Sequence, residues 1–338
     1  MRIFAFTPML GALFASALLT FSEPARAASA ASDFASPEAL MEWAATYREH
    51  PAPYRLPEAV HAMQRFGLLG DTEKRGFCTG FIAGVLGTNP KDGPGLVAGM
   101  FPMPGKEQAV IIKAIAYSGR PDWEDVLIRY RSKMPLREPM IADYLNGKEP
   151  LLMQADLDQD TELIYTLWGY YAATGQYQPV MRIIDALRWA KAKDEPGFSW
   201  SKLTAGWTRD PKGVDKATIG GTAKWTLASY GERNRNLIAL YRSELPRQPK
   251  EIAAPLRDVI EAAELFKSED VREDQLTAIQ EAQKQQVVEA NGMSKLETAG
   301  SIGIATGCVA ATALGQAQVT VPCVIGGALY SGAVKLLH

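Results

Sequence analysis

The feature that most constrains the fold is a helix–glycine–helix outline that occurs three times at one spacing. The turn glycines of the three segments are Gly119, Gly175 and Gly231. The intervals from 119 to 175 and from 175 to 231 are both 56 residues, and a constant interval between similar segments is typical of repeat proteins. The segments are KAIAYSGRPDWEDVLIRYRSKMP (113–135), GYYAATGQYQPVMRIIDALRWAK (169–191) and WTLASYGERNRNLIALYRSELP (225–246). We predict an array of helical hairpins; the alternative is chance similarity between unrelated hairpins.

Helix-forming residues dominate the rest of the chain, and alternating β-branched runs are nearly absent. Clusters of Pro and Gly at 50–57, 87–95 and 101–105 separate segments of ordinary helix length. Hydrophobic residues make up 47% of the 338 residues and charged residues 22%, which suits a folded chain with a large core. The predicted fold class is all-α: an α-solenoid-like array of helical hairpins, then a polar helix, then an apolar, glycine-rich helical hairpin.

The second of the three segments carries a family resemblance. The spacing found in tetratricopeptide repeats is matched by Leu167, Tyr171, Gly175 and Tyr177. The apolar stripe of the second helix continues through Val180, Ile184 and Leu187. The hairpin therefore resembles a tetratricopeptide unit, although the interval of 56 residues is longer than the usual repeat of about 34. The resemblance implies an array of α-hairpins with long connections that binds a protein or peptide in a concave groove.

The first 27 residues predict export. Arg2 forms a short positive region, an apolar run covers 3–21, and Ala25-Arg26-Ala27 has the small-x-small form of a signal-peptidase site. We expect cleavage after Ala27; the alternative is an uncleaved N-terminal anchor. Export predicts a periplasmic or secreted protein in an oxidising compartment, where disulfides persist.

The C-terminal segment 299–334 contains no Lys, Arg, Asp, Glu or His. Small residues recur in it every four positions, as Ala299, Gly303, Gly307, Ala311 and Gly315. Such a stripe allows another helix backbone to approach closely. We expect two antiparallel helices over 299–314 and 321–334, with Cys308 and Cys323 joined by a disulfide near the turn. Three environments remain open for this hairpin: a tightly packed core, a membrane or lipid surface, and a self-associating patch.

These observations predict a division of the chain into five parts. They are a signal peptide (1–27), an N-terminal segment (28–59), a helical-hairpin repeat domain (60–265), a polar connecting helix (266–297) and the apolar glycine-rich hairpin (298–338). The polar helix is rich in Glu, Gln and Ala and has only a narrow apolar stripe.

Motifs for catalysis, cofactors or metals are nearly absent. The sequence has no HExxH, CxxC or GxSxG motif, and its three histidines are His50, His61 and His338. The stretch DLDQD (156–160) begins like a calcium loop, but Thr161 stands where such a loop needs Gly, so an acidic helix start is preferred. Cys78 lies in an apolar setting and is expected to be a buried structural thiol. We assign no catalytic, cofactor-binding or metal-binding residue.

The predicted function is non-enzymatic binding or scaffolding of a protein or peptide in the cell envelope. A net charge of −2 argues against a general nucleic-acid binder. Trp200, Trp207 and Trp225 more often cap a core than form a binding surface. One alternative is an envelope hydrolase whose carboxylates converge in the fold; another is membrane contact through 298–334. A concave groove lined with aromatic rings and Arg favours binding, and a closed pocket with two carboxylates within about 10 Å favours hydrolysis.

Overall fold

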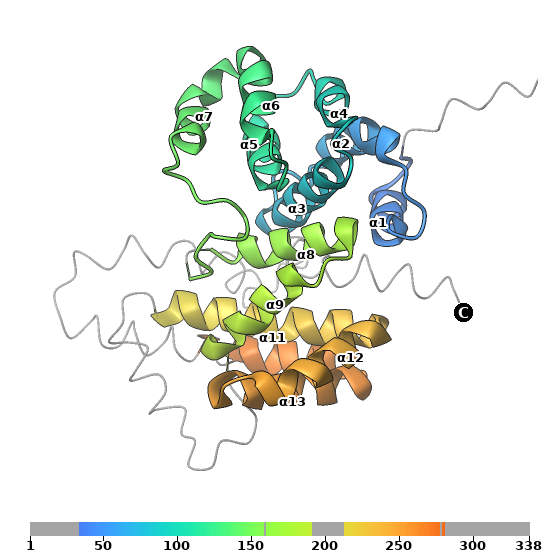
Figure 1. The fold of residues 1–338 in the computed structure, drawn as a ribbon. Coiled ribbons are helices and arrows are strands. Elements are labelled where there is room, and N and C mark those ends of the chain that lie inside the picture. Colours follow the sequence, from blue (N-terminus) through green and yellow to red (C-terminus); the bar gives the residue numbers. More distant parts are fainter. Residues whose placement is uncertain (1–33, 159, 191–212, 278, 281–338) are drawn as a thin grey trace, which may run out of the picture. The chain divides into compact units, whose positions relative to one another are not determined.

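The computed structural model describes residues 34–158, 160–190, 213–277 and 279–280. Over these residues the chain is all-α, and no strand occurs among them (Figure 1). Several predictions lie outside this part of the chain. They concern the signal peptide, Trp200 and Trp207, the small-residue stripe from Ala299 to Gly315, and the pair Cys308 and Cys323.

The α-helices follow one another with short connections. Their bounds are α1 Pro37–Thr46, α2 Leu56–Arg65, α3 Thr72–Thr88, α4 Gly93–Gly99, α5 Gln108–Tyr117, α6 Trp123–Tyr130, α7 Glu138–Leu145, α8 Glu162–Thr174, α9 Gln178–Asp185, α11 Gly213–Arg233, α12 Arg235–Glu244 and α13 Lys250–Glu264. Short 3-10 helices lie at Pro53–Arg55, Arg131–Lys133, Pro135–Arg137, Ala186–Trp189 and Leu245–Arg247. Residues 268–277 are helical as well.

Local sequence signals determine where the first of these helices begin. The Ser36 side chain accepts a hydrogen bond from the backbone N–H of Ala39 (3.2 Å), and Pro37 occupies the first helical position of α1. Asp71 caps α3 in the same way, by accepting from the backbone N–H of Lys74 (3.1 Å). Each cap satisfies a backbone N–H group that has no partner inside its helix.

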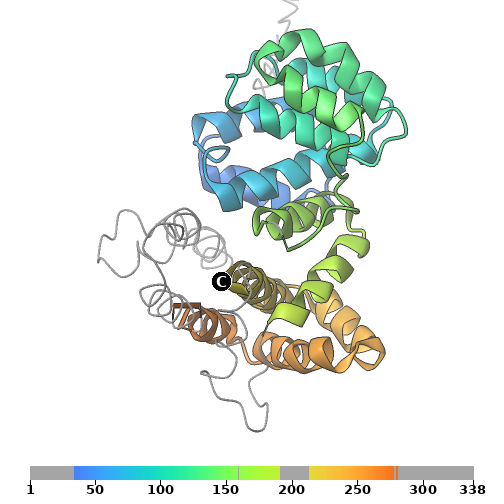
Figure 2. The ribbon, with the colours of Figure 1, turned by 90° about the vertical axis from the view of Figure 1, so that its left-hand side faces the viewer.

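Glycines allow α3 and α8 to pack with their backbones close together, and the two helices lie side by side in Figures 1 and 2. On α3 these glycines recur every four residues, as Gly76, Gly80 and Gly84. A Cβ on Gly80 would overlap the carbonyl oxygen of Thr166 in α8, and a Cβ on Gly169 of α8 would overlap the carbonyl oxygen of Phe77. These glycines of α3 have the same four-residue spacing as the small residues predicted to form a contact stripe near the C-terminus, and in α3 this spacing allows the contact with α8.

Two of the predicted turn glycines lie between helices. Gly119 follows α5 with φ +70°, and Gly175 ends α8 with φ +69°. Both are in the left-handed region that glycine adopts without steric cost. The backbone N–H of Gly175 donates to the carbonyl of Tyr171 (2.8 Å), which closes the last turn of α8.

The prediction of a turn at Gly231 is wrong, because Gly231 lies inside α11. The helix ends two residues later, and Asn234 begins the next helix. A Cβ on Gly231 would lie 3.0 Å from the Cβ of Ala263 in α13 and 3.2 Å from Cε2 of Tyr241 in α12. Glycine here serves the close packing of three helices, so the equal interval of 56 residues does not mark three equivalent turns.

The α8–α9 hairpin is the segment that resembles a tetratricopeptide unit. The rings of Tyr171 and Tyr177 stack across the turn, with 6.1 Å between centroids and 25° between planes. The fully buried apolar side chains of this hairpin include Leu167, Val180, Ile184 and Leu187. The stripe predicted for the second helix therefore faces the core.

Helices α11, α12 and α13 pack together through polar as well as apolar contacts (Figure 2). Lys224 Nζ of α11 lies 2.6 Å from Asp258 Oδ2 of α13, with both side chains largely buried. The Tyr241 hydroxyl donates to the backbone carbonyl of Leu227 (3.1 Å), and burial raises the pKa of Tyr241. Lys224 and Tyr241, two buried polar side chains in this part of the core, thus find their partners on other helices.

The predicted boundary between 28–59 and 60–265 falls inside α2, so the structure places no boundary there. Phe34, Leu40 and Ala44 belong to the same core as α2 and α3. The predicted start of the polar helix at 266 falls in the turn between α13 and the helical residues 268–277. Within the described ranges, no helix combines the length and the apolar character needed to span a membrane.

Candidate functional site

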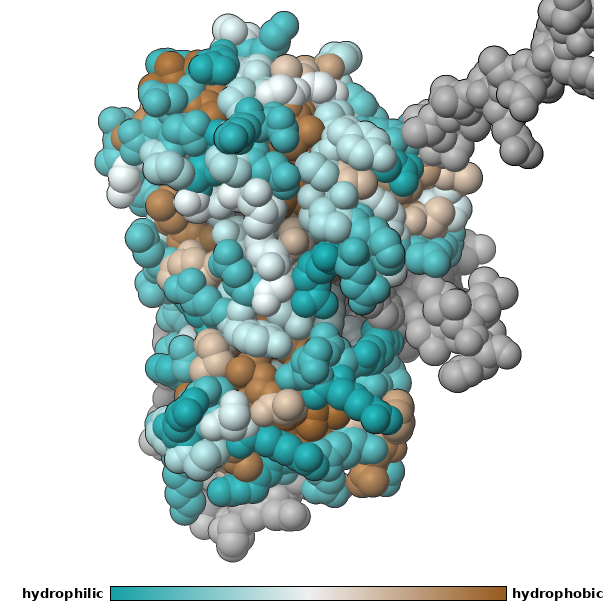
Figure 3. Space-filling view, turned by 45° about the vertical axis from the view of Figure 1, so that its right-hand side comes forward, coloured by the Kyte–Doolittle hydropathy of each residue, from teal (hydrophilic) through white to brown (hydrophobic). Residues whose placement is uncertain are grey.

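A groove of about 600 Å³ lies among α1, α3, α8 and the junction of α11 with α12. This volume is within the range of roughly 300–1,000 Å³ that is usual for ligand sites. The lining combines aromatic rings, guanidinium groups and carboxylates. On the face drawn in Figure 3, the coloured residues show hydrophobic groups scattered among hydrophilic ones, and no continuous apolar surface. The groove lining itself is a mixture of aromatic, aliphatic and charged side chains.

Three tyrosines and Phe77 supply the aromatic part of the lining. Tyr171 and Tyr177 are the stacked pair of the α8–α9 turn, and Tyr177 is 44% exposed. Tyr230 of α11 stacks on the buried ring of Trp168 in α8, with 3.9 Å between centroids and 3° between planes. The rings are held by the core behind them, so they present a fixed surface to the groove.

Guanidinium groups reach the groove from two places. Arg48, in the turn after α1, lies over the ring of Tyr171, with its Cζ 4.7 Å from the ring centroid. Arg233 and Arg235 are exposed at the junction of α11 and α12. Burial raises the pKa of Tyr171, while Arg48 and the hydrogen bond from Asn234 act in the opposite direction. The phenol therefore stays neutral near pH 7 beside a permanently charged guanidinium.

The carboxylates of the groove come from α1 and the turn that follows it. Glu38 and Glu42 are four residues apart on α1, and Glu49 follows in the turn. All three are exposed. Among the described residues none of these carboxylates forms an ion pair with an arginine of the groove, so their charges are available to a ligand.

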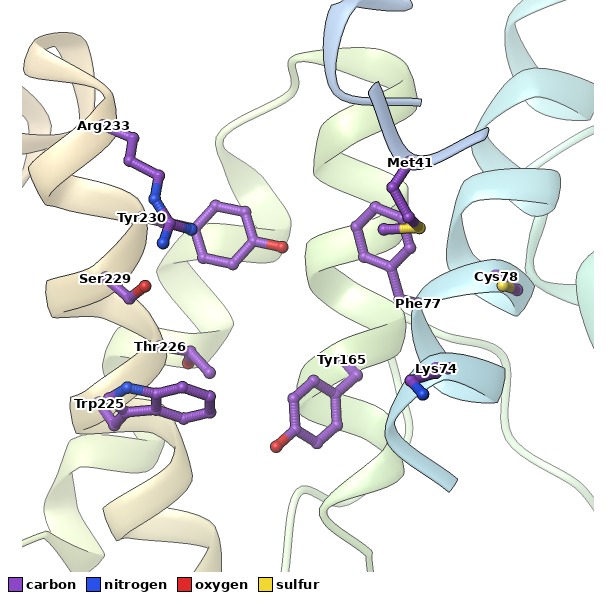
Figure 4. Close-up of a pocket in the computed structure, with 10 residues that line it drawn as sticks. All are labelled: Met41, Lys74, Phe77, Cys78, Tyr165, Trp225, Thr226, Ser229, Tyr230 and Arg233. Carbon is purple, nitrogen blue, oxygen red and sulfur yellow. The ribbon is translucent and has the colours of Figure 1, made fainter. Parts of the chain in front are cut away.

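The groove continues into a narrower slot of about 80 Å³ between α11 and α3 (Figure 4). Met41, Phe77, Tyr230 and Arg233 line both spaces. The ring of Trp225 projects from α11 and the ring of Tyr165 from α8 toward the same space. Trp225 is only 9% exposed and its Nε1 has no hydrogen-bond partner. The sequence favoured a core role for Trp225, and the structure shows a ring that is both buried and part of this slot.

Cys78 borders the slot from α3 and is 1% exposed. Burial raises the pKa of its thiol to about 12, and the more distant charge of Asp71 acts in the same direction. A thiol with such a pKa is almost entirely protonated at neutral pH and is a poor nucleophile. Cys78 is therefore part of the apolar wall, as the sequence led us to expect.

Two other candidates from the sequence, His61 and Asp160, lie outside the groove. His61 has its Nδ1 3.1 Å from Gln64 Oε1 and its Nε2 3.0 Å from the Gly99 carbonyl. Asp160 accepts a hydrogen bond from the backbone N–H of Glu162 (2.9 Å), so it acts at the start of α8. No group of three or more His, Cys, Asp and Glu side chains with metal-binding geometry occurs in the described part of the chain.

Sequence reasoning missed most of the groove. Its charged residues come from α1 and from the α11–α12 junction, which are separated by nearly the whole described chain. No sequence motif contains both Glu42 and Arg235, and the sequence around each of them is that of an ordinary exposed helix residue. Only Tyr171, Gly175 and Tyr177 were marked in advance, and these lie at one edge of the groove, where Gly175 approaches the side chain of Arg48.

The comparisons with known proteins add no assignment, because no protein-family model, no curated protein and no solved structure matches this chain.

Proposed function

We propose that this protein is a non-enzymatic binding protein of the cell envelope that holds a polypeptide segment in the groove among α1, α8 and α12. The observation that carries the proposal is the lining itself, which contains Tyr171, Tyr177 and Tyr230 together with Arg48, Arg233 and Arg235. Tyr and Arg are the residue types that contribute most to protein-binding energy, because they combine a large contact area with polar groups.

The form of the groove supports a polypeptide rather than a small ligand. It is an open cleft of about 600 Å³ with a narrow slot at its side. An open cleft leaves one side of its ligand in water, which suits a chain that continues beyond the site. Pockets for small molecules usually bury most of the ligand surface.

We interpret the α8–α9 hairpin as a tetratricopeptide-like unit within a helical array. This interpretation is supported by the glycine turn at Gly175, the stacked pair of Tyr171 and Tyr177, and the buried stripe of α9. In arrays of this kind a concave surface binds extended segments of other proteins. Export by the predicted signal peptide places the proposed partner in the periplasm or outside the cell.

Site-specific photocrosslinking in the producing cell tests the proposal. A benzophenone amino acid at position 177 should crosslink to a polypeptide, since Tyr177 lies exposed in the groove. The same amino acid at position 54 is the control, because Tyr54 is 74% exposed and does not line the groove.

A blocking variant makes the test specific for the groove. Asn236→Trp fills the groove from α12 and should abolish the crosslink from position 177. Ala239→Trp on the exposed side of the same helix should leave the crosslink unchanged. A crosslink that survives Asn236→Trp, or that forms equally from position 54, would contradict binding in the groove.

A further inference from the structure

The slot beside the groove has the size of one aliphatic side chain. Its volume is about 80 Å³. A dry cavity that accepts a benzene ring measures about 150 Å³, which is nearly twice as large. The slot is therefore too small for a whole aromatic ring but large enough for the branched end of a Leu, Ile or Met side chain.

The chemistry of the slot also suits an aliphatic group. Most of its wall is apolar: the thioether of Met41, the rings of Phe77, Tyr165 and Trp225, and the protonated thiol of Cys78. Thr226 and Ser229 add two hydroxyl groups on the α11 side. Lys74 and Arg233 also line this space, and their long aliphatic stems let the charged ends reach water. An apolar side chain inserted here leaves water and contacts ring faces, which stabilises the complex by burial of apolar area.

Charges beside the slot differ between the two sides of the groove. Glu38 and Glu42 project from α1, whereas Arg235 projects from the start of α12. Figure 4 shows Met41 of α1 and Arg233 of α11 on opposite sides of the slot. Arg48 is the one guanidinium on the α1 side, and it is held over the ring of Tyr171. A ligand in the groove thus meets carboxylates along α1 and the guanidinium group of Arg235 at the start of α12.

From these observations we infer that the occupant of the groove is a polypeptide segment with one aliphatic anchor residue between charges of opposite sign. The anchor enters the slot. A Lys or Arg of the segment faces the carboxylates of α1, and an Asp or Glu faces Arg235. The inference rests on the proposed function, because it specifies the segment that the same groove binds. Charge segregation of this kind selects one orientation of the bound chain, since the reversed chain brings like charges together.

A library of capped synthetic peptides tests the inference on the full-length protein. Its members differ only in a central residue (Leu, Phe or Ser) and in the charges that flank it, and binding is measured by fluorescence anisotropy. Peptides with Leu between a basic and an acidic residue should bind about tenfold more tightly than those with Ser, and more tightly than those with Phe. Reversing the order of the two charges should weaken binding about tenfold at low salt.

Changes in the protein should alter these preferences in a predictable direction. Met41→Ala enlarges the slot and should shift the preference from Leu to Phe, whereas Met41→Leu should keep Leu preferred. Arg235→Glu should make a basic peptide residue favourable where wild type prefers an acidic one. Arg242→Glu, on the same helix but outside the groove, should leave the ranking unchanged.

The outcomes separate the inference from the proposed function. In one outcome, peptides bind to the wild type and fail to bind to Asn236→Trp, but their order of affinity is the same for Met41→Ala and Arg235→Glu as for the wild type. This outcome overturns the inference and leaves the proposed function standing. Peptides that bind equally with either order of charges overturn it as well. Failure of every peptide to bind, together with no crosslink from position 177, overturns both.

Discussion

The indole ring of Trp168 in α8 and the phenol ring of Tyr230 in α11 lie parallel, with 3.9 Å between their centroids and 3° between their planes. Trp168 is fully buried, and Tyr230 lines both the groove and the slot. The stack therefore joins the core behind α8 to the surface that we propose as the binding site. Stacked rings at this distance contribute energy beyond the burial of their area.

Removal of the Tyr230 ring should weaken both the fold and the site. We expect Tyr230→Ala to lower the free energy of unfolding by about 2–4 kcal/mol, because the face of Trp168 that the tyrosine ring covers loses its partner and a cavity remains. Tyr230→Phe keeps the ring and should retain most of the stability. Urea denaturation measures both; equal losses for the two variants would show that the ring stack contributes nothing.

A glycine should tolerate substitution only where no neighbouring atoms occupy the place of the new side chain, and Gly80 of α3 and Gly95 of α4 differ in this respect. Gly80→Ala should destabilise the protein by about 3 kcal/mol or more, because its Cβ would overlap the Thr166 carbonyl and force α3 from α8. Gly95→Ala in α4 is the matched control, since a Cβ there meets nothing within 4 Å. It should be neutral or stabilising by up to about 1 kcal/mol. Similar melting temperatures for the two variants would refute the close contact.

The carboxylate of Glu162 should contribute more stability than surface carboxylates do. It is largely buried, with Arg75 Nη2 2.6 Å from one oxygen and Lys113 Nζ 3.4 Å from the other. Glu162→Gln should lower the free energy of unfolding by about 2–4 kcal/mol. This is less than for a fully buried ion pair, because the side chains of Arg75 and Lys113 are each 33% exposed. Glu138→Gln removes the exposed partner of Arg131 and should have a much smaller effect. Chemical denaturation compares the two.

The ion pair of Asp122 with Arg120 should make stability depend on pH in the acid range. The hydrogen bond from the Arg120 guanidinium holds the pKa of Asp122 below its ordinary value of 3.8. Because the folded-state pKa is the lower one, the pair stabilises the protein above about pH 4, and this contribution is lost as pH falls further. The stability difference between wild type and Asp122→Asn should therefore shrink below pH 4. A constant difference from pH 7 to pH 2 would rule this out; Asp125→Asn on the same helix is the control.

Cys78 should resist alkylation in the native protein. With a pKa of about 12, roughly one thiol in ten thousand is ionised at pH 8, and the sulfur is buried as well. Mass-spectrometric mapping after iodoacetamide treatment should find Cys78 unmodified in the folded chain and modified in urea. Rapid native labelling would show that the slot opens to the sulfur.

The disulfide between Cys308 and Cys323 stays a prediction, and a non-reduced peptide map tests it directly.

The sequence alone was sufficient for the helical class of the described chain and for several of its local features. The helical class follows from residue propensities and from the Pro and Gly positions, and both act within a few residues. Ser36 and Asp71 cap their helices for the same local reason, and Gly119 and Gly175 adopt the left-handed conformation that a tight turn needs. The apolar stripe of α9 was also readable, because its period is that of the helix.

Only the tertiary structure decided which residues meet across the chain. Gly231 has the local setting of a turn residue, but its role depends on Ala263 and Tyr241, which approach it from other helices. Glu42 and Arg235 share one groove although local patterns connect neither to the other. Packing between helices depends on how whole faces fit together, whereas propensity and spacing report only on neighbours along one helix. The groove and its slot are therefore products of tertiary packing, and the helices that form them are products of local sequence.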